Sequence, residues 1–410
     1  MSNHKAIVAS IKVRKHPNAD RLQLGTCLGF QVVVGLNVKD GEIGLLFPEG
    51  LQLSEEFARA NDLVRRKNED GTYSGGFFEE NRRVRAQKFR GEVSDAFWIP
   101  LQSLASFGDF SKLREGDLLD EFSGVKLCQK YFTKATRARF SQQKKSNLVS
   151  KVFPQHFETE QLRLNSHKIP LNEIVYITEK LHGTSGRFGY VPVERQLRWW
   201  ERLLQRLGVK IQTTEYTYVN GSRRVILSET KDFRWQAAKL FEGKLHKNEI
   251  VYFEIVGFDG EAHIMPPHSS ERAKDKALVK QYGPQMEYLY GCPRGGFDVY
   301  VYRIAIINED GVLYDLPWKD VKNRCEEMAV KHVPELLSWY SNDPELIMEF
   351  AEKLSDGPST LDERHIREGV CIRVDSAKNV FVMKHKGFNF KVLEGIVKLD
   401  DDYVDTEEIA

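Results

Sequence analysis

Residues 174–186 of this 410-residue chain read IVYITEKLHGTSG and place a lysine at the end of a run of strand-forming residues. The first four are β-branched or aromatic and predict a strand, and residues 187–191 predict a second one. Lys180 therefore ends a strand and enters a turn that contains Gly183 and Gly186. This placement suits a nucleophile, because the strand holds the amine and the glycines let a ligand approach the backbone. Taken alone, Lys180 is better explained as an ordinary surface lysine.

Five further short segments follow toward the C-terminus, each with polar residues among strand formers. They are residues 220–224 (NGSRR), 253–257 (FEIVG), 300–304 (YVYRI), 368–370 (EGV) and 384–386 (KHK). Glu254 lies in an apolar run, where an unpaired carboxylate is costly to bury, so it should have a partner. Lys384 and Lys386 share one strand face, which is either solvated or directed at a triphosphate. Together the segments predict a nucleotide pocket around a reactive amine.

The ordered motifs resemble those of a known family. Residues 179–184 (EKLHGT), 253–257 (FEIVG), 367–370 (REGV) and 383–386 (MKHK) resemble the covalent nucleotidyltransferases, specifically the ATP-dependent RNA ligases. His182 stands where DNA ligases and capping enzymes usually carry Asp, and with residues 153–161 it resembles the nick-sealing branch. The resemblance implies an α+β fold. Its ligase part would be a nucleotidyltransferase domain, ATP-grasp-like, with antiparallel sheets and flanking helices.

Carried over residue by residue, the resemblance implies how ATP is held. Lys180 would accept AMP as a phosphoramidate. Arg223 would contact phosphate or ribose near the nick, with Arg224 as a possible substitute. Tyr302 would stack on adenine, although Tyr300 competes for this role because both occupy strand positions of the same parity. To attack, Lys180 must give up a proton near neutral pH, which nearby positive charge would favour.

The same resemblance implies a metal ion and a set of site residues. Glu254 would bind the ribose or a metal-bound water, and Glu368 would anchor the metal shell, directly or through water. Mg²⁺ or Mn²⁺ fits carboxylate, water and phosphate ligands better than zinc does. The implied catalytic residues are Lys180, Glu254, Glu368, Lys384 and Lys386. The implied ATP- or AMP-binding residues are Glu179, Lys180, Leu181, Gly183, Arg223, Glu254, Tyr302, Glu368, Lys384 and Lys386.

The N-terminal third predicts a small β-barrel. Strand-like runs at residues 5–13, 21–28, 30–34, 43–47 and 83–89 alternate with turn residues. Residues 13–22 (VRKHPNADRL) and 84–94 (VRAQKFRGEVS) resemble tRNA-binding OB domains, so we expect an OB-type β-barrel over residues 1–130. Such barrels hold nucleic acid with basic and aromatic side chains. The RNA-binding candidates are Arg14, Lys15, Arg85, Lys88 and Arg90; ordinary solvated charges are the alternative.

A basic stretch separates the two predicted domains. From Lys130 to Lys151 the chain has seven basic residues and no acidic one. We interpret residues 131–152 as a linker that also touches phosphates, with Lys144 and Lys145 as candidate RNA contacts. The nucleotidyltransferase domain would span residues 153–400, with an acidic tail at 401–410.

Two insertions predict helices. Residues 195–207 include Trp199 and Trp200, and residues 318–354 are expected to form two or three helices that include Trp339 and Tyr340. Packing on the sheet is the expected role of both. The alternative for the first is an RNA-docking surface, which would use Arg198, Arg202 and Arg206.

Composition sets outer limits. The net charge is +1, with 60 basic and 59 acidic residues, so a nucleic-acid surface must come from local segregation of charge. Five scattered cysteines without a CxxC spacing favour a cytoplasmic or other reducing intracellular compartment over structural zinc. The chain shows neither an apolar signal core nor about 18 consecutive apolar residues, so we expect no membrane association.

The sequence therefore predicts an ATP-dependent RNA ligase that seals 3′-hydroxyl and 5′-phosphate ends through lysyl-AMP and RNA-adenylate. Its expected partner is RNA, as a nicked duplex or another structured RNA, without an obligate protein partner. Two alternatives stay open: a GTP-dependent capping-type nucleotidyltransferase and a non-catalytic RNA-binding protein. The 24 residues after Lys386 are too few for the further OB domain that capping enzymes and DNA ligases carry there.

Overall fold

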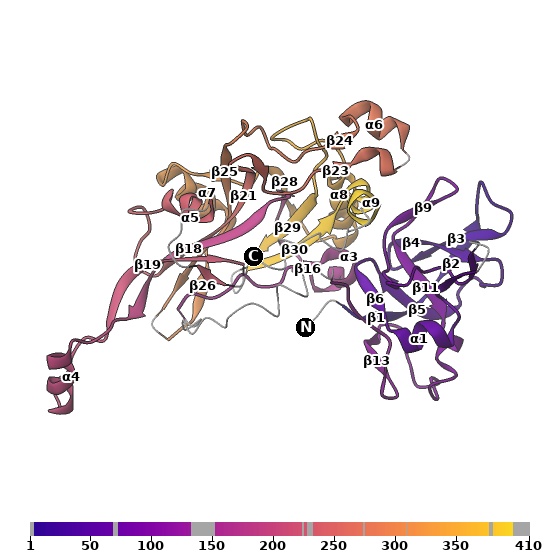
Figure 1. Ribbon diagram of the computed structural model, residues 1–410, viewed down its shortest axis with the longest axis horizontal. Coiled ribbons are helices and arrows are strands. Elements are labelled where there is room, and N and C mark those ends of the chain that lie inside the picture. Colours follow the sequence, from indigo (N-terminus) through magenta and orange to yellow (C-terminus); the bar gives the residue numbers. More distant parts are fainter. Residues whose placement is uncertain are drawn as a thin grey trace. The chain divides into compact units, whose positions relative to one another are not determined.

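The computed structural model describes residues 4–68, 73–132, 152–223, 225–227, 233–273, 275–308, 310–376 and 380–396. The chain divides into two compact units (Figure 1). Unit 1 is Met1–Thr133 with Ser269–Gln281 and Phe388–Asp400, and unit 2 is Lys134–His268 with Tyr282–Gly387 and Asp401–Ala410. Both contain sheets of mostly antiparallel strands beside helices, which confirms the predicted α+β class.

Unit 1 is built from short β-strands. A four-stranded sheet has the order β11 (Ala96–Pro100), β5 (Ile43–Pro48), β1 (Ala6–Ser10) and β12 (Leu118–Leu119). A three-stranded sheet contains β2 (Lys12–Lys15), β3 (Leu22–Cys27) and β4 (Phe30–Gly35). The paired strands are β6 (Leu51–Leu53) with β15 (Cys128–Lys130), β7 (Arg65–Lys67) with β8 (Tyr73–Gly75), β9 (Gln87–Phe89) with β10 (Glu92–Ser94), and β13 (Glu121–Phe122) with β14 (Val125–Lys126).

These strands agree with the sequence pattern, with two differences. The run predicted at 5–13 divides at Ile11, which is fully buried and donates its N–H to the Glu42 carbonyl, so β1 and β2 join different sheets. Of the run at 83–89, the named strand β9 covers residues 87–89. Across the described residues the hydrogen-bonded ladders do not close into a barrel, so the OB-type barrel stays a prediction.

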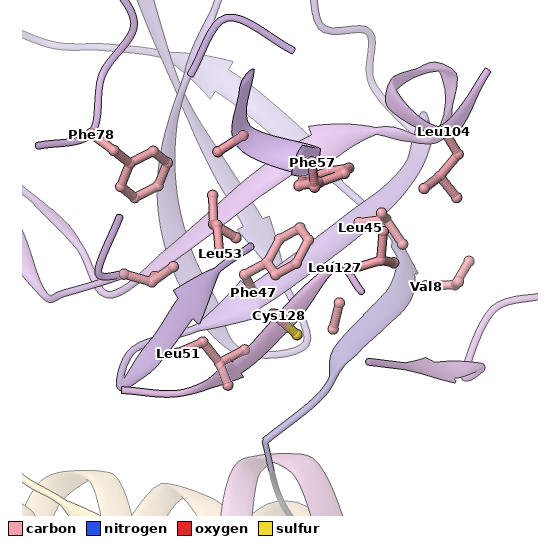
Figure 2. Close-up of a cluster of buried hydrophobic side chains, with 13 residues drawn as sticks. Val8, Leu45, Phe47, Leu51, Leu53, Phe57, Phe78, Leu104, Leu127 and Cys128 are labelled. Atoms are coloured by element: carbon pink, nitrogen blue, oxygen red, sulfur yellow. The ribbon is translucent and has the colours of Figure 1, made fainter. Parts of the chain in front are cut away.

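Phenylalanine and leucine side chains fill the core of unit 1 (Figure 2). The hydroxyl of Ser54 caps helix α1 (Glu55–Ala60) by accepting the Phe57 N–H at 3.1 Å, and this fixes Phe57 in the core. Its ring centroid lies 5.6 Å from that of Phe47. Burial raises the pKa of Cys128 to about 12, so this thiol stays protonated and packs as a small apolar group.

Segments distant in sequence complete unit 1. They are η3 (Ser270–Ala273), α6 (Lys276–Tyr282) and α9 (Phe388–Ile396), beyond the predicted range 1–130, while η1 (Leu101–Leu104) lies within it. Lys391 of α9 is 6% exposed, and its Nζ lies 3.4 Å from both Asp95 Oδ2 and Glu49 Oε1. Lys88 Nζ lies 2.8 Å from Asp275 Oδ2. Ion pairs thus connect these late segments to the N-terminal strands.

Unit 2 contains two larger sheets. The five-stranded sheet has the order β16 (Glu160–Gln161), β30 (Val380–Lys386), β29 (Gly369–Asp375), β17 (Glu173–Lys180) and β28 (Glu335–Ser341). The eight-stranded sheet has the order β20 (Ile226–Leu227), β19 (Thr214–Ser222), β18 (Thr184–Glu194), β21 (Glu249–Asp259), β25 (Phe297–Ile307) and β26 (Leu313–Asp315), with β22 (Ala262–His263) on β21 and β27 (Lys331–His332) on β25. The short strands β23 (His268–Ser269) and β24 (Gln285–Met286) form a separate pair.

The chain crosses from one sheet to the other directly after Lys180. Strand β17 ends at this lysine in the five-stranded sheet, and β18 begins at Thr184 in the eight-stranded sheet. Gly183 makes the crossing possible, because a Cβ there would lie 2.5 Å from the Ile255 carbonyl oxygen. The lysine is therefore held where the two sheets meet, on the rigid end of a strand whose interior residues Val175 and Ile177 are fully buried.

Helices of unit 2 confirm part of the prediction for the insertions. They are α3 (Leu162–Asn165), η2 (Ser166–Lys168), α4 (Trp199–Arg206), α5 (Phe233–Lys239), α7 (Trp318–Glu327) and α8 (Pro344–Ser355). The helical assignment of Trp339 and Tyr340 was wrong, because both lie on strand β28. Trp339 packs on Phe350 while Tyr340 is exposed, so the two follow the two-residue period of a strand.

The packing expected for residues 195–207 was also wrong. Helix α4 lies at the far end of the β18–β19 hairpin (Figure 1). Trp199 and Leu207 are 79% and 72% exposed, so they do not pack on the sheet.

No helix in the described part of the chain combines the length and apolar character needed to cross a membrane.

Removing the buried charge of Lys391 tests whether α9 is an integral part of unit 1. Lys391→Met keeps the bulk of the side chain but takes the cation away from buried Asp95, which should destabilise unit 1 by about 3 kcal/mol. Hydrogen exchange followed by mass spectrometry should then show faster exchange in α9 and β11, with β17 and β29 unchanged. The exposed Lys112→Met is the control. Unchanged exchange in α9 would contradict this assignment.

Candidate active site

A buried carboxylate brings two lysines together. Glu368 is 0% exposed, and its two oxygens lie 2.7 Å from Lys180 Nζ and 3.2 Å from Lys386 Nζ. Three neighbouring strands create this arrangement, because Gly369 pairs with Lys180 of β17 on one side and with Lys386 of β30 on the other. The strands approach so closely that a Cβ at Gly369 would lie 2.2 Å from the His385 carbonyl oxygen.

The charge state of Glu368 follows from these neighbours. Burial alone would raise its pKa, but the charges of Lys180 and Lys386, together with a contact from His182, hold the pKa well below the usual range. The carboxylate therefore stays ionised at neutral pH. His182 Nδ1 lies 3.6 Å from the oxygen that Lys180 contacts, so this ionised group organises both the lysine and the turn after it.

Residues on both sides of Lys180 form hydrogen bonds with segments that come before Glu368 in the sequence. Glu179 Oε2 accepts hydrogen bonds from the backbone N–H of Thr360 at 2.9 Å and from its hydroxyl at 2.6 Å. The His182 N–H donates to Tyr290 Oη at 2.6 Å, and the Tyr290 ring packs edge-on against His365 at 4.5 Å. The Glu179 side chain and the His182 backbone, on either side of Lys180, are thus both held by hydrogen bonds.

Next to Lys180 a pocket collects most of the predicted ATP-binding residues. The predicted residues that line it are Glu179, Lys180, Leu181, Arg223, Glu254, Tyr302 and Lys384. The Ser185 hydroxyl donates to Glu254 Oε2 at 3.0 Å, which supplies a partner for the carboxylate in the apolar run. Glu368 and Lys386 join this group through the ion pairs with Lys180, and Gly183 lies in the turn. Arg224 lies outside the described residues.

A β-bulge distinguishes Tyr302 from Tyr300. Tyr252 pairs with Arg303, and Phe253 pairs with Val301, so Tyr302 is an extra residue in β25. Strict alternation would direct Tyr302 and Arg303 to opposite faces, yet both line the Lys180 pocket. Tyr300 lines a different hollow and donates its hydroxyl to Asp298 Oδ2 at 3.2 Å. The pocket therefore contains Tyr302.

Several residues of the pocket wall were not predicted from the sequence. The residues concerned include His156, Phe157, Thr159, Arg303, Trp318 and Arg373. The first three fall within residues 153–161, which carried the family resemblance but no assigned role. Alternation hid Arg303, because only the bulge brings it to the pocket. Trp318 is the first residue of helix α7, in the insertion that was expected only to pack on the sheet.

His156 and Arg303 form one rigid part of that wall. The Arg303 guanidinium lies between the rings of Phe157 and Tyr252, at 4.5 and 4.4 Å from their centroids. It donates to His156 Nδ1 at 3.3 Å. Burial, followed by the charges of Arg303, Arg223 and Lys384, lowers the pKa of His156 well below its usual value. His156 is therefore neutral, with Nδ1 as the acceptor.

The carboxylates of Glu254 and Glu368 are compatible with a divalent cation whose ligands are mostly water and phosphate oxygens. The described residues contain no group of three or more His, Cys, Asp or Glu side chains arranged to hold a metal ion. Glu254 lines the pocket, whereas Glu368 is bound by two lysines. This donor set fits Mg²⁺ or Mn²⁺ that keeps several waters and takes its other ligands from phosphate oxygens.

The RNA-binding candidates of unit 1 lie on two segments that meet. His16 Nε2 is 3.2 Å from the Phe89 carbonyl, and Asn18 donates to the Arg90 carbonyl at 3.0 Å. The candidates differ in their contacts. Arg14, Lys15 and Arg90 are exposed, and the Arg14 side chain donates a hydrogen bond to Gln31. In contrast, Arg85 forms an ion pair with Glu79 at 3.3 Å, and Lys88 forms one with Asp275. Lys144 and Lys145 lie outside the described residues.

Comparison with solved structures shows what fold this chain has. It resembles RNA ligase of Naegleria gruberi: a mutant solved with ATP and Mn has 17% identity and a TM-score of 0.60, over 94% of this chain and 98% of that one. The same ligase with PPi has 18% identity and a TM-score of 0.60, over 94% and 97%. Another mutant, in its apo form, has 18% identity and a TM-score of 0.61, over 95% and 98%. At this identity the likeness establishes the fold.

Sequence comparison then identifies the family. No curated protein matched the chain. A model of the family described as RNA ligase matches residues 173–392, which is 220 of the 410 residues and includes Lys180, Glu254, Glu368 and Lys386. Because this match covers more than half of the chain and the fold agrees with it, the protein belongs to the RNA ligase family.

Proposed function

We propose that this protein is an ATP-dependent RNA ligase that joins a 3′-hydroxyl to a 5′-phosphate. One observation carries the proposal: the amine of Lys180 lines a pocket together with Arg223 and Lys384 while the buried carboxylate of Glu368 holds it at 2.7 Å. Membership of the RNA ligase family supports it. So does the similar fold of the Naegleria gruberi RNA ligase, which was solved with ATP and Mn and with PPi.

Three displacements at phosphorus would make up the reaction. In the first, the Lys180 amine loses a proton and attacks the α-phosphorus of ATP; a nitrogen–phosphorus bond forms and pyrophosphate leaves. In the second, an oxygen of the RNA 5′-phosphate attacks the same phosphorus and releases Lys180, which gives RNA-adenylate. In the third, the 3′-hydroxyl attacks the RNA 5′-phosphorus, AMP leaves and the phosphodiester forms.

The pocket residues would divide the recognition of ATP between them. Tyr302 would stack on adenine beside the rigid His156 wall. Arg223 and Lys384 would bind phosphate oxygens and stabilise the charge that develops during transfer. Glu254, held by Ser185, would bind the ribose or a metal-bound water. The presence of these side chains in the pocket wall, and the Ser185 hydrogen bond to Glu254, support these proposed roles.

A divalent cation would complete the site. Glu254 lines the pocket and would hold Mg²⁺ or Mn²⁺, and waters and the phosphates of ATP would be the other ligands of the cation. Bound there, the cation would neutralise phosphate charge and make it easier for the neighbouring amine to release its proton. Glu368 would anchor this arrangement indirectly, through the two lysines that it positions.

The RNA would be a nicked duplex or another structured RNA, bound in part by unit 1. Arg14, Lys15 and Arg90 are exposed and are the strongest candidates for phosphate contacts, whereas Arg85 and Lys88 already have acidic partners. The two segments that carry these residues meet through hydrogen bonds, and an OB domain likewise brings loops together to bind nucleic acid.

The covalent step can be tested directly by the mass of the intact protein. After incubation with ATP and Mg²⁺ or Mn²⁺, the wild-type chain should gain the mass of one AMP, and Lys180→Ala should gain nothing because the attacking amine is gone. Lys168→Ala, an exposed lysine paired with Glu160, is the matched control and should be labelled normally.

Other outcomes of this measurement discriminate between functions. Labelling by GTP in place of ATP would indicate a capping-type enzyme. Lack of labelling by either nucleotide, with RNA binding retained, would contradict ligation and indicate a non-catalytic RNA-binding protein.

The Thr360 contact should position Lys180 without binding ATP. Thr360→Val keeps the volume but removes the hydroxyl that donates to Glu179, so the rate of lysyl-AMP formation at saturating ATP should fall about tenfold. The KM for ATP should stay within about twofold, because no ATP contact is lost. Thr360→Ser restores the hydroxyl and should restore the rate. An equal loss in both variants would contradict this positioning role.

A further inference from the structure

Helix α4 presents an apolar stripe. Trp199, Trp200, Leu203 and Leu207 lie within one 100° sector of the helix, and they are 79%, 42%, 52% and 72% exposed. Exposing four large apolar side chains together on one helix is unfavourable in water, so the stripe has the character of an interaction surface that a partner covers.

A row of arginines runs beside this stripe. At 100° per residue, Arg198, Arg202 and Arg206 fall on the sector next to Trp199, and all three are exposed. Residues 195–210 contain five basic residues and one acidic residue, a net charge of +4. The acidic one, Glu201, is buried. The outward face is therefore cationic as well as apolar.

Internal contacts hold α4 in a fixed orientation. Arg195 binds both carboxylate oxygens of Glu201, at 2.6 and 3.0 Å, and donates to the Gln212 carbonyl at 2.9 Å across the hairpin. The Arg198 N–H donates to Glu201 at 2.7 Å and caps the helix. Arg195 therefore neutralises the single acidic residue of the segment. Arg198, Arg202 and Arg206 face outward.

The same hairpin begins at the Lys180 pocket. Ser185 of β18 and Arg223, directly after β19, line the pocket, whereas Glu194 and Thr214 form the last pair before the tip. Glu194 lies eight positions beyond Gly186 on strand β18, a span of about 27 Å. A ligand that extends from the pocket to α4 must therefore be long, whereas ATP is too short to reach it.

We propose that α4 and its hairpin form an arm that binds the RNA substrate at a distance from the ends being joined. The inference rests on the proposed RNA ligase function. The arginine row would bind phosphates, and Trp199 would stack on an unpaired base, which is the combination that proteins use for RNA loops and bulges. Charge complementarity favours RNA as the occupant, since the tip is cationic and the family acts on RNA.

Two variants test this arm. Arg202→Glu with Arg206→Glu should weaken binding of a long nicked RNA at least tenfold and lower the slope of log K against log salt by about 2. Trp199→Ala should weaken binding roughly tenfold, but only for RNA with unpaired bases in the arm's reach, and Trp199→Phe should restore it. Arg294→Glu with Lys319→Glu, also exposed in unit 2, is the charge-matched control and should leave binding unchanged.

Substrate length separates contact from damage to the fold. About five base pairs are shorter than the roughly 27 Å of strand between the pocket and the tip. Duplexes with about five pairs on each side of the nick should therefore be bound equally by wild type and variants. Duplexes with about 20 pairs on each side should distinguish wild type from the variant with Arg202→Glu and Arg206→Glu. Lysyl-AMP formation needs no RNA and should be unchanged in every arm variant.

Several results would overturn the proposal. Equal binding of long RNA by all variants, with lysyl-AMP formation intact, would reject the arm while leaving the ligase function standing. Loss of lysyl-AMP in wild type would instead reject the function itself. Two other results count only if the arm variants leave RNA binding unchanged. Binding of the wild type to anionic lipid vesicles would then assign α4 to a membrane surface. Self-association that Trp199→Ala abolishes would assign α4 to contact with a second copy of the chain.

Discussion

The structure of the site depends on a single buried carboxylate. Glu368 has no exposure to solvent, so its charge must be balanced by cations within the protein, and Lys180 and Lys386 supply them. The ion pairs act on both partners, because the carboxylate also fixes the positions of the two amines. Three adjacent strands and a glycine between them bring the groups close enough for this. The reactive lysine is thereby positioned before any nucleotide arrives.

Positioning extends outward from this ion pair. Thr360 binds the side chain of Glu179, and Tyr290 binds the backbone N–H of His182. The crossing at Gly183 then carries the chain into the second sheet, whose strands provide Glu254 and Tyr302. The pocket is therefore assembled at a junction between two sheets instead of on a loop. That arrangement suits chemistry in which a nucleophile and a phosphorus atom must meet at a defined distance and angle.

Much of this was predictable from sequence, for identifiable reasons. The apolar runs around Glu254 and Tyr302 gave the strands, and the ordered lysine and carboxylate motifs gave most of the pocket. What failed depended on tertiary contacts. Arg303 reaches the pocket through a β-bulge, which alternation does not reveal. Trp339 joins a strand because β17 offers a pairing edge. The addition of α9 to unit 1 depends on Lys391 meeting Asp95, a pairing nearly 300 positions apart in the sequence.

The most direct test of this account is the rate of lysyl-AMP formation in Glu368→Gln. The amide keeps the shape of the side chain but cannot balance two ammonium groups, so Lys180 should lose its fixed position. In a single-turnover measurement at saturating ATP, we predict a fall of about 100-fold with ATP binding retained. The exposed Glu363→Gln is the matched control and should react like the wild type. An unchanged rate in Glu368→Gln would contradict the central role given to this carboxylate.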